Sequence, residues 1–298
     1  MEGYYILLDI GGTQIKGCIS DKEGNIKGKI AIFDSLSNMV AEVIFGNLVH
    51  IVANFMAETS GGSLQGIGLA FPGPFDYEKG ICLMREVGKY ESIFGRSIEM
   101  EMKKRMASIN EVPFYFLNDV TAFALGEIRL GEAMHAKKGF CICIGTGMGS
   151  AFFADGEVVT EQGDGVPENG WLYKQPYGES IADDYISVRG LAKLSKSICK
   201  MELSGQQLYE LCLHGNKDAL TVYKEFGNDL KEILLPVLDE FKPEMIVLGG
   251  QISNSFAFFG ESLLAECQHR NIRICIDSKT SERTLQGIFA RIKEQERH

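Results

Sequence analysis

Long apolar runs, closely spaced cysteines and basic clusters are all scarce in this sequence, and each scarcity excludes a class of protein. No stretch reaches the roughly 18 uncharged apolar residues that a membrane-spanning helix needs. The eight cysteines contain no C-x-x-C pair and the five histidines lie far apart, so neither a zinc site nor a Cys–His nucleophile is predicted. The first residues show no basic segment followed by an apolar one, so no secretory signal is expected.

The charge balance argues against nucleic-acid binding. The formal net charge is −10, whereas proteins that bind phosphate backbones usually present a basic face. The basic cluster Lys103-Lys104-Arg105 follows alternating acidic residues in "SIEMEMKKRM", which is typical of a solvated helix face. The scattered cysteines are typical of buried free thiols in a reducing compartment, so we expect a cytoplasmic protein. The 298 residues are enough for about two domains.

Two glycine-containing hairpins are the most informative local patterns. The first, "YILLDIGGTQIKGCISD", runs from an apolar strand through Gly11-Gly12-Thr13 into a second, alternating strand. The second, "GFCICIGTGMGSAFFADGEVV", places Gly145-Thr146-Gly147 at its turn, 134 residues after the first. An acidic turn follows each hairpin at the same offset, with Asp21 in the first and Asp155 in the second. The repeat predicts two copies of one α/β domain type.

The remaining pattern predicts a mixed α/β architecture. A helix is expected from Met39 to Glu58, followed by the buried strand "LQGIGLAFPGPFD". "VPFYFLNDV" is predicted as a strand and "TAFALGEIRLGEA" as a helix. Later helices are expected at residues 182–197, 208–213, 220–241 and 255–270, with strands at "MIVLGGQIS" and "IRICI" and a last helix from Leu285. We predict an N-terminal domain of residues 1–118, against which the last helix (about 285–298) packs, and a C-terminal domain of residues 119–284.

Two interpretations of the glycine turns are open. A turn that needs glycine for its backbone is the simpler one. Alternatively, backbone N–H groups that no Cβ shields could bind phosphate oxygens, with Thr13 and Thr146 as further donors. Asp9 would then suit a magnesium ion held through water, because Mg²⁺ prefers carboxylate oxygens and keeps much of its hydration.

Asn118 and Asp119 stand where a strand leads into a helix, which is where open α/β sheets bind ligands. Both residue types are favoured helix N-caps. A carboxylate there could equally act as a general base that takes a proton from an alcohol as it attacks phosphorus. One residue could cap the helix while the other serves the chemistry.

Five motifs in this order resemble the ROK family of sugar kinases, within the actin/hexokinase/heat-shock ATPase superfamily. They are "LLDIGGTQIKGCISD", "GIGLAFPGP", "FLNDVTAFALGE", "CICIGTGMGSAFFADGEVV" and "IVLGGQIS", and the likeness extends from Leu7 to about Ala290. The resemblance implies two actin-like, ribonuclease H-like α/β domains, each a mixed sheet flanked by helices, with an interdomain cleft. It also implies ATP and Mg²⁺ as cofactors.

The resemblance assigns roles to individual residues. Asp119 matches the catalytic base, with Asn118 as a sugar contact and Gly73 in the loop that closes over the sugar. The nucleotide-binding set is Asp9, Gly11, Gly12, Thr13, Gly145, Thr146, Gly147, Gly249 and Gly250, in which Asp9 serves Mg²⁺ through water and the last pair packs against adenosine.

The acceptor side departs from the family pattern. In "GVPENGWLYKQPYGES", Glu168 matches the sugar-binding glutamate, but Trp171 stands where the family has a histidine. No cysteine occurs between Cys143 and Cys199, so the family's zinc motif is not expected. Trp171 is open to two interpretations, as an ordinary surface or core aromatic or as a stacking platform for a sugar. The usual Asn before Pro-Gly-Trp is also replaced, in "MREVGKYESIFG".

The sequence therefore predicts an ATP-dependent carbohydrate kinase of the glucokinase type, a phosphotransferase with an alcohol acceptor. The alternative is a non-catalytic sugar or nucleotide sensor of the same fold that acts through a protein partner. The expected partners are a small sugar substrate and ATP, without nucleic acid or membrane, in a homodimer or larger homo-oligomer. The sugar and the hydroxyl that is phosphorylated are not specified by these patterns.

Overall fold

The computed structural model describes residues 3–59 and 61–297. The chain forms two compact units: unit 1 holds the residues up to Gly126 and those from Ser281 onward, and unit 2 holds Glu127–Thr280. The chain passes between the units within helix α3 (Asp119–Leu130) and at the start of helix α10 (Thr280–Gln295). The predicted folding-domain boundary between residues 118 and 119 stays a prediction.

Unit 1 is built on a five-stranded mixed sheet with the strand order β3-β2-β1-β4-β7. Its strands are β1 (Gly3–Ile10), β2 (Gln14–Asp21), β3 (Ile26–Asp34), β4 (Ser63–Phe71) and β7 (Phe114–Asn118). The hairpin strands β1, β2 and β3 are antiparallel, whereas β1, β4 and β7 run parallel. The carboxyl ends of the three parallel strands therefore meet at one edge of the sheet.

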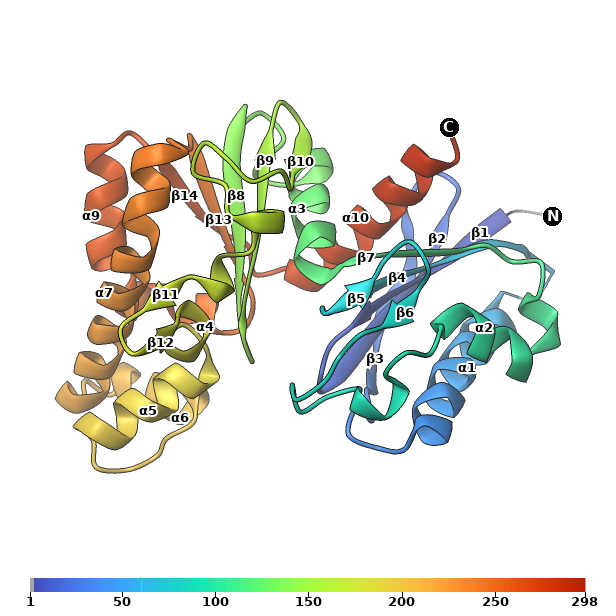
Figure 1. Cartoon of the computed structure of the whole chain (residues 1–298), viewed down its shortest axis with the longest axis horizontal. Helices are drawn as coiled ribbons and strands as arrows, with labels where there is room; N and C mark the ends of the chain where they lie inside the picture. Colours follow the sequence, from blue (N-terminus) through green and yellow to red (C-terminus); the bar gives the residue numbers. More distant parts are fainter. Residues whose placement is uncertain (1–2, 60, 298) are drawn as a thin grey trace. The chain divides into compact units, whose positions relative to one another are not determined.

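Helices cover both faces of this sheet. In Figure 1, α1 (Ala41–Glu58) and α2 (Ile98–Arg105) lie on one side and α10 lies on the other. Ile6 and Leu8 of β1 join the core beneath α1, while Leu7 faces the α10 side near Gly68. Because both faces of β1 are covered, its sequence is almost continuously apolar. Smaller elements are β5 (Phe75–Asp76), β6 (Ile81–Cys82), η1 (Glu91–Ile93) and η2 (Ala107–Ile109).

Unit 2 repeats the sheet of unit 1, with the strand order β10-β9-β8-β13-β14. The strands are β8 (Lys138–Ile144), β9 (Met148–Ala154), β10 (Glu157–Val159), β13 (Met245–Gly249) and β14 (Arg273–Ile276). The pairing directions match, because β8 to β10 are antiparallel while β8, β13 and β14 are parallel. The predicted fold class, two mixed sheets flanked by helices, is confirmed.

The helices of unit 2 follow the predicted periodicity with several corrections. They are α4 (Ala182–Tyr185), α5 (Val188–Ile198), α6 (Gly205–Leu213), α7 (Lys217–Glu240), α8 (Phe256–Phe259) and α9 (Glu261–His269), with η3 (Glu168–Gly170), η4 (Leu172–Lys174), η5 (Ile252–Ser255) and the short strands β11 (Pro176–Tyr177) and β12 (Ser180–Ile181). The single helix predicted at 182–197 is wrong, because Ser187 caps a new helix through the Gly190 amide. The helix predicted at 255–270 is likewise divided, at Gly260.

Two glycines allow α3 and α10 to approach closely. A Cβ on Gly126 would lie 2.0 Å from the carbonyl oxygen of Arg283. A Cβ on Gly287 would lie 1.8 Å from the carbonyl oxygen of Ala122. Real Cβ atoms do not approach so closely, so the backbone-to-backbone packing of these helices depends on glycine at both positions.

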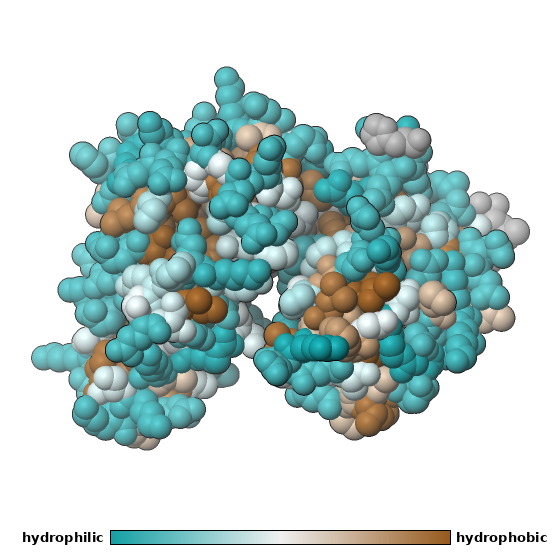
Figure 2. Space-filling view, viewed as in Figure 1, coloured by the Kyte–Doolittle hydropathy of each residue, from teal (hydrophilic) through white to brown (hydrophobic). Residues whose placement is uncertain are grey.

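The surface in the view of Figure 2 is mostly hydrophilic and carries small apolar patches. The exposed large apolar side chains include Met39, Val40 and Met100. Among the helices of residues 3–59 and 61–297, none combines the length and apolarity required to cross a membrane.

Candidate functional site

The strand ends of unit 1 bring together polar residues that are far apart in the sequence. Asp9 of β1 pairs with Ala70 of β4, and Phe71 of β4 pairs with Asn118 of β7. Asp119 follows Asn118 as the first residue of α3. Asp9 and Asp119 are therefore neighbours at one sheet edge, and the charge of Asp119 affects the ionisation of Asp9.

The cap of helix α3 is provided by Asn118. Its Oδ1 accepts hydrogen bonds from the backbone amides of Val120 and Thr121, both at 3.1 Å. Its Nδ2 donates to the hydroxyl of Tyr77 at 3.1 Å, which fixes the orientation of the amide. Asp119 Oδ1 accepts from the Val120 amide at 2.9 Å. Since Asn118 satisfies two helix amides, the capping interpretation applies mainly to Asn118 and leaves Asp119 as the candidate base.

Burial changes the proton affinity of both carboxyl groups. Burial, together with the negative charge of Asp119, raises the pKa of Asp9 to about 7, against the opposing effect of Lys16. Burial also raises the pKa of Asp119, and the ammonium group of Lys89 opposes this rise. A carboxylate with a raised pKa is a better proton acceptor near neutral pH. The pair is therefore suited to general base chemistry.

The first turn, Gly11-Gly12-Thr13, has its carbonyl groups bound and two amides free. The carbonyls accept from Tyr90 Oη (to Gly11), Ser35 Oγ and Ser37 Oγ (to Gly12) and the Ser35 amide (to Thr13), at 2.5–2.9 Å. The Gly11 amide closes the turn on the Gln14 carbonyl at 2.9 Å. Within the described residues, the amides of Gly12 and Thr13 find no acceptor. Such a turn presents N–H groups to an incoming anion.

The second turn, Gly145-Thr146-Gly147 in unit 2, has the same arrangement with different donors. Its three carbonyls accept from the Val188 amide at 3.0 Å, Arg189 Nη1 at 3.1 Å and the Gly145 amide at 2.9 Å. The amides of Thr146 and Gly147 have no acceptor in the part of unit 2 that the structure describes. A Cβ on Gly147 would lie 2.8 Å from Asp183 Oδ1, so the glycine leaves room that a side chain would fill.

The two turns differ in length by one residue. Ile10 pairs with Ile15 across the first turn, whereas Ile144 pairs with Met148 across the second. The offset of 134 residues between the two hairpins therefore holds up to the turns and changes by one residue after them.

The predicted adenosine pair Gly249-Gly250 lies beside the second turn. Gly249 ends β13 and pairs with Cys143 of β8. Gly250 has φ +87° and a Cβ on it would lie 2.4 Å from the Ile144 carbonyl oxygen. Its amide donates to Thr280 Oγ1 at 2.9 Å. The two glycine motifs of unit 2 thus share one edge of its sheet.

Gly73 joins the unit 1 cluster through Tyr77. The Tyr77 hydroxyl donates to the Phe71 carbonyl at 3.0 Å and accepts from Asn118. A Cβ on Gly73 would lie 3.4 Å from this hydroxyl. The structure therefore brings Gly73 and Asn118 to the same oxygen.

Glu168 and Trp171 form a separate local arrangement in unit 2. The Trp171 amide donates to the Glu168 carbonyl at 3.1 Å across the η3 turn. The Trp171 ring is half-buried, 5.9 Å from the Tyr173 ring and 5.0 Å from Lys174 Nζ. The Glu168 side chain is exposed. Both interpretations of Trp171 remain open on this geometry.

Several residues of the unit 1 site were missed by the sequence predictions. Lys16 lies opposite Asp9 across the hairpin and donates to Ser281 Oγ at 2.6 Å. In the alternating strand β2, a lysine at this position is ordinary and carried no signal of its role. Lys89 and Tyr90 come from a loop whose pattern carries no local sign of its contact with the first turn.

In residues 3–59 and 61–297, no group of three or more His, Cys, Asp or Glu side chains could hold a metal ion. All eight cysteines are free thiols.

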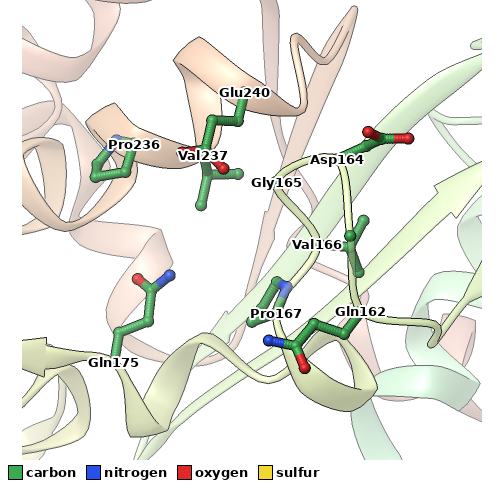
Figure 3. A pocket seen from close by; sticks show the side chains of 10 residues that line it. Gln162, Asp164, Gly165, Val166, Pro167, Gln175, Pro236, Val237 and Glu240 are labelled. Atoms are coloured by element: carbon green, nitrogen blue, oxygen red, sulfur yellow. The ribbon is translucent and has the colours of Figure 1, made fainter.

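A cavity of about 320 Å³ lies elsewhere in unit 2. Figure 3 shows Pro236, Val237 and Glu240 of α7 facing the loop of residues 162–167, with Gln175 nearby. None of the predicted site residues lines this cavity, so it is not the candidate site.

The strand order and the paired glycine turns are those of an actin-like α/β protein. A model of the ROK family matches residues 5–286, so this chain belongs to the ROK family. An N-acetyl-D-glucosamine kinase of Haemophilus influenzae is 25% identical over 87% of each chain. A glucokinase of Halalkalibacterium halodurans is 24% identical over 88% of this chain and 83% of its own.

Solved structures agree on the fold. A ROK hexokinase from Thermus thermophilus has a TM-score of 0.77 at 20% identity, covering 98% of this chain and 99% of that one. A ROK glucokinase from Streptomyces griseus, in complex with glucose and AMPPNP, has a TM-score of 0.77 at 17% identity, covering 98% of this chain and 100% of that one.

A transcriptional regulator is also among the relatives found by sequence. The xylose repressor of Bacillus subtilis is 23% identical over 90% of this chain and 69% of its own. Family membership supports sugar phosphorylation in general terms.

Proposed function

We propose that this protein transfers the terminal phosphoryl group of ATP to a hydroxyl of a sugar or sugar derivative. The observation that carries the proposal is the unit 1 sheet edge, where Asp9 and Asp119 lie beside a turn with two free amides. A phosphate-binding turn next to a buried carboxylate supplies what phosphoryl transfer needs most, a positioned phosphate and a proton acceptor. The kinases among the relatives support the same reaction class.

The glycine turn of each unit binds phosphate groups of ATP in this proposal. The free amides of Gly12 and Thr13 and those of Thr146 and Gly147 donate to phosphate oxygens. Because the carbonyls of both turns are already hydrogen-bonded, the amides are held outward before the nucleotide arrives, and little reorganisation is required. Gly249-Gly250 leaves backbone without side chains next to the second turn, and we assign it to the adenosine.

Asp9 is the residue that would hold Mg²⁺ through water. Its carboxylate is a ligand of the type that Mg²⁺ prefers, and a nearby cation would favour the charged form that burial and Asp119 disfavour. A bound Mg²⁺ supplies positive charge that offsets the charge of the phosphates.

Asp119 accepts the proton of the attacking hydroxyl. Burial gives this carboxyl group a raised pKa, and its place at the start of α3 is fixed by the cap at Asn118. We assign acceptor contacts to Asn118 and Gly73 in unit 1, and to Glu168 and Trp171 in unit 2. The Asn118 side chain is held for this role, because its Nδ2 donates to Tyr77 and its Oδ1 accepts from the α3 amides.

The test is an ADP-release assay with Mg-ATP against hexoses, amino sugars, N-acetyl sugars and polyols. We expect at least one acceptor to release ADP, and Asp119→Asn to reduce kcat by about 10²–10⁴ with ADP affinity retained. Asp34→Asn, an exposed change at the end of β3, is the matched control and should keep full activity.

Three outcomes are informative. Turnover by Asp119→Asn at the wild-type rate would exclude Asp119 as the base. Sugar binding with no turnover on any acceptor would favour the sensor function. The absence of ATP binding would exclude the phosphate role of both turns.

The compartment and assembly remain parts of the proposal. The eight free thiols fit a reducing cytoplasm. A homodimer or larger homo-oligomer is the assembly we expect, and sedimentation measures it directly.

A further inference from the structure

The loop of residues 83–90 places a lysine against the first turn. A Cβ on Gly12 would lie 3.1 Å from Cδ of Lys89, so the lysine stem crosses directly over this glycine. The Lys89 side chain is half-buried. Its ammonium group also acts on the carboxyl group of Asp119, whose pKa it lowers against the effect of burial. One side chain thus connects the phosphate-binding turn with the candidate base.

Tyr90 fixes the position of this lysine. The Tyr90 side chain is fully buried, and its hydroxyl donates to the Gly11 carbonyl at 2.8 Å. Its backbone amide donates to the Ser37 carbonyl at 2.7 Å, and Ser37 Oγ in turn donates to the Gly12 carbonyl. The backbone next to Lys89 is therefore attached to the first turn through the carbonyls of Gly11 and Gly12. The backbone from which the Lys89 side chain extends is held in place by the hydrogen bonds of Tyr90.

Among the described residues, the ammonium group of Lys89 has no direct hydrogen-bond or ion-pair partner. Lys16, the other lysine of the site, donates to Ser281. A half-buried cation between a phosphate-binding turn and the candidate base is suited to an anionic phosphoryl group. The region between the first turn and Asp119 is also where a phosphoryl group would move from ATP to the acceptor hydroxyl.

We propose that Lys89 is a catalytic residue that donates a hydrogen bond to a non-bridging oxygen of the phosphoryl group during its transfer. This inference rests on the proposed function. In the step, the acceptor oxygen forms a bond to the γ-phosphorus and the bond from that phosphorus to the β–γ bridging oxygen breaks. The electron pair of the broken bond leaves with ADP, and the proton of the hydroxyl passes to Asp119. Lys89 keeps its proton throughout and offsets the charge on the equatorial oxygens.

The position of Lys89 favours the phosphoryl group over the body of the acceptor. A residue that recognised a distant charged group of a sugar would lie away from the phosphate turn, whereas Lys89 lies over Gly12 itself.

The test compares Lys89→Met, Lys89→Arg and the control Arg85→Met. Arg85 belongs to the same loop and stacks over the Phe94 ring at 3.7 Å, so its replacement removes the same charge without touching the first turn. Two quantities are measured for each variant. The first is the affinity for MgADP with and without aluminium fluoride, which imitates the phosphoryl group in transfer. The second is kcat and KM for the acceptor found in the ADP-release assay.

We expect wild type and Arg85→Met to bind MgADP more tightly with aluminium fluoride. Lys89→Met should lose most of this gain with its MgADP affinity unchanged, and its kcat should fall by about 10²–10³. Lys89→Arg should recover part of both losses, because it restores the charge. Equal fluoride gains in wild type and Lys89→Met would overturn the inference.

A higher KM for the acceptor at unchanged kcat would also overturn it, by assigning Lys89 to the acceptor. A wild-type protein that binds MgADP but shows no fluoride gain would overturn it as well. A wild-type protein that binds no MgADP would instead contradict the proposed function and remove the inference with it.

Discussion

Replacement of Asp9 by Asn should stabilise the folded protein at neutral and higher pH while it impairs the reaction. Burial and the neighbouring Asp119 raise the pKa of Asp9 from its ordinary 3.8 to about 7. Between these two pH values the folded protein holds a proton that the unfolded chain has released. Stability therefore falls as the pH rises from about 4 to about 7, and the full cost is present above pH 7. Asn carries no charge, so the variant escapes this cost.

The magnitude follows from the shift. A rise of about three pH units at 1.36 kcal/mol per unit gives roughly 4 kcal/mol as the upper limit for the gain at pH 8. Because Asp9 and Asp119 share their charge effects, we expect a gain of about 2–4 kcal/mol. At an unfolding entropy of about 2.1 cal/mol/K per residue, this corresponds for a chain of this size to an increase in Tm of about 3–6 °C.

The assay is thermal unfolding without nucleotide at several values between pH 5 and pH 8. The difference in Tm between Asp9→Asn and wild type should grow with pH and level off above about pH 7. Asp21→Asn is the control of opposite sign. Burial tends to raise the pKa of Asp21, but hydrogen bonds from Lys27 and Asn25 hold this pKa below its ordinary value. Lys27 Nζ lies 2.8 Å from Asp21 Oδ2. Asp21→Asn should therefore lose stability across the whole range.

A difference in Tm that stays constant from pH 5 to pH 8 would refute the reasoning for Asp9, since it would show that the carboxylate ionises without cost. A lower Tm for Asp9→Asn at pH 8 would refute it more strongly.

Two further predictions concern a helix crossing and the tryptophan. Gly287→Ala should lower the free energy of unfolding by about 1–3 kcal/mol or more, because its Cβ would lie 1.8 Å from the Ala122 carbonyl oxygen. Gly46→Ala, in α1 with nothing within 4 Å of its Cβ, should instead add about 0.5–1 kcal/mol in the same denaturant titration, and similar effects of both changes would contradict the packing argument. Trp171 is the only tryptophan, so a saturating acceptor should change the intrinsic fluorescence. Unchanged emission with a proven acceptor would argue against the sugar contact.

The local parts of the fold were predictable from sequence. Both hairpins have a strand, a glycine turn and an alternating strand within about 20 residues, so their pattern is complete in one short segment. The helix predicted from Met39 to Glu58 begins at Ala41 and ends at Glu58. Helix α10 starts at Thr280, not at Leu285, because its first turn is polar and carries no apolar period.

The contacts that build the candidate site were less predictable from the sequence. The positions of Asp9 and Asp119 at the sheet edge were predictable, because they follow from the local strand pattern and the sheet topology. The choice of Asn118 as the helix cap depends on the orientation of one amide, which Tyr77 sets from another loop. The bond from Tyr90 to Gly11 joins residues 79 positions apart, and no local periodicity encodes such a pair.

The division of the chain into units sets an order for folding during synthesis. Unit 2 is one continuous segment with its own core, so all of it is present before the unit 1 residues from Ser281 onward are translated. Unit 1 must wait for those residues, because Tyr5 of β1 donates to Glu296 at 2.6 Å and Gly68 of β4 lies against Ile288. Domains generally fold as they become complete. A nascent chain should therefore fold unit 2 while unit 1 is still incomplete. A premature stop after residue 280 should leave unit 2 folded, whereas the sheet of unit 1, at whose edge Asp9 and Asp119 lie, would lack the helix α10 that covers one of its faces.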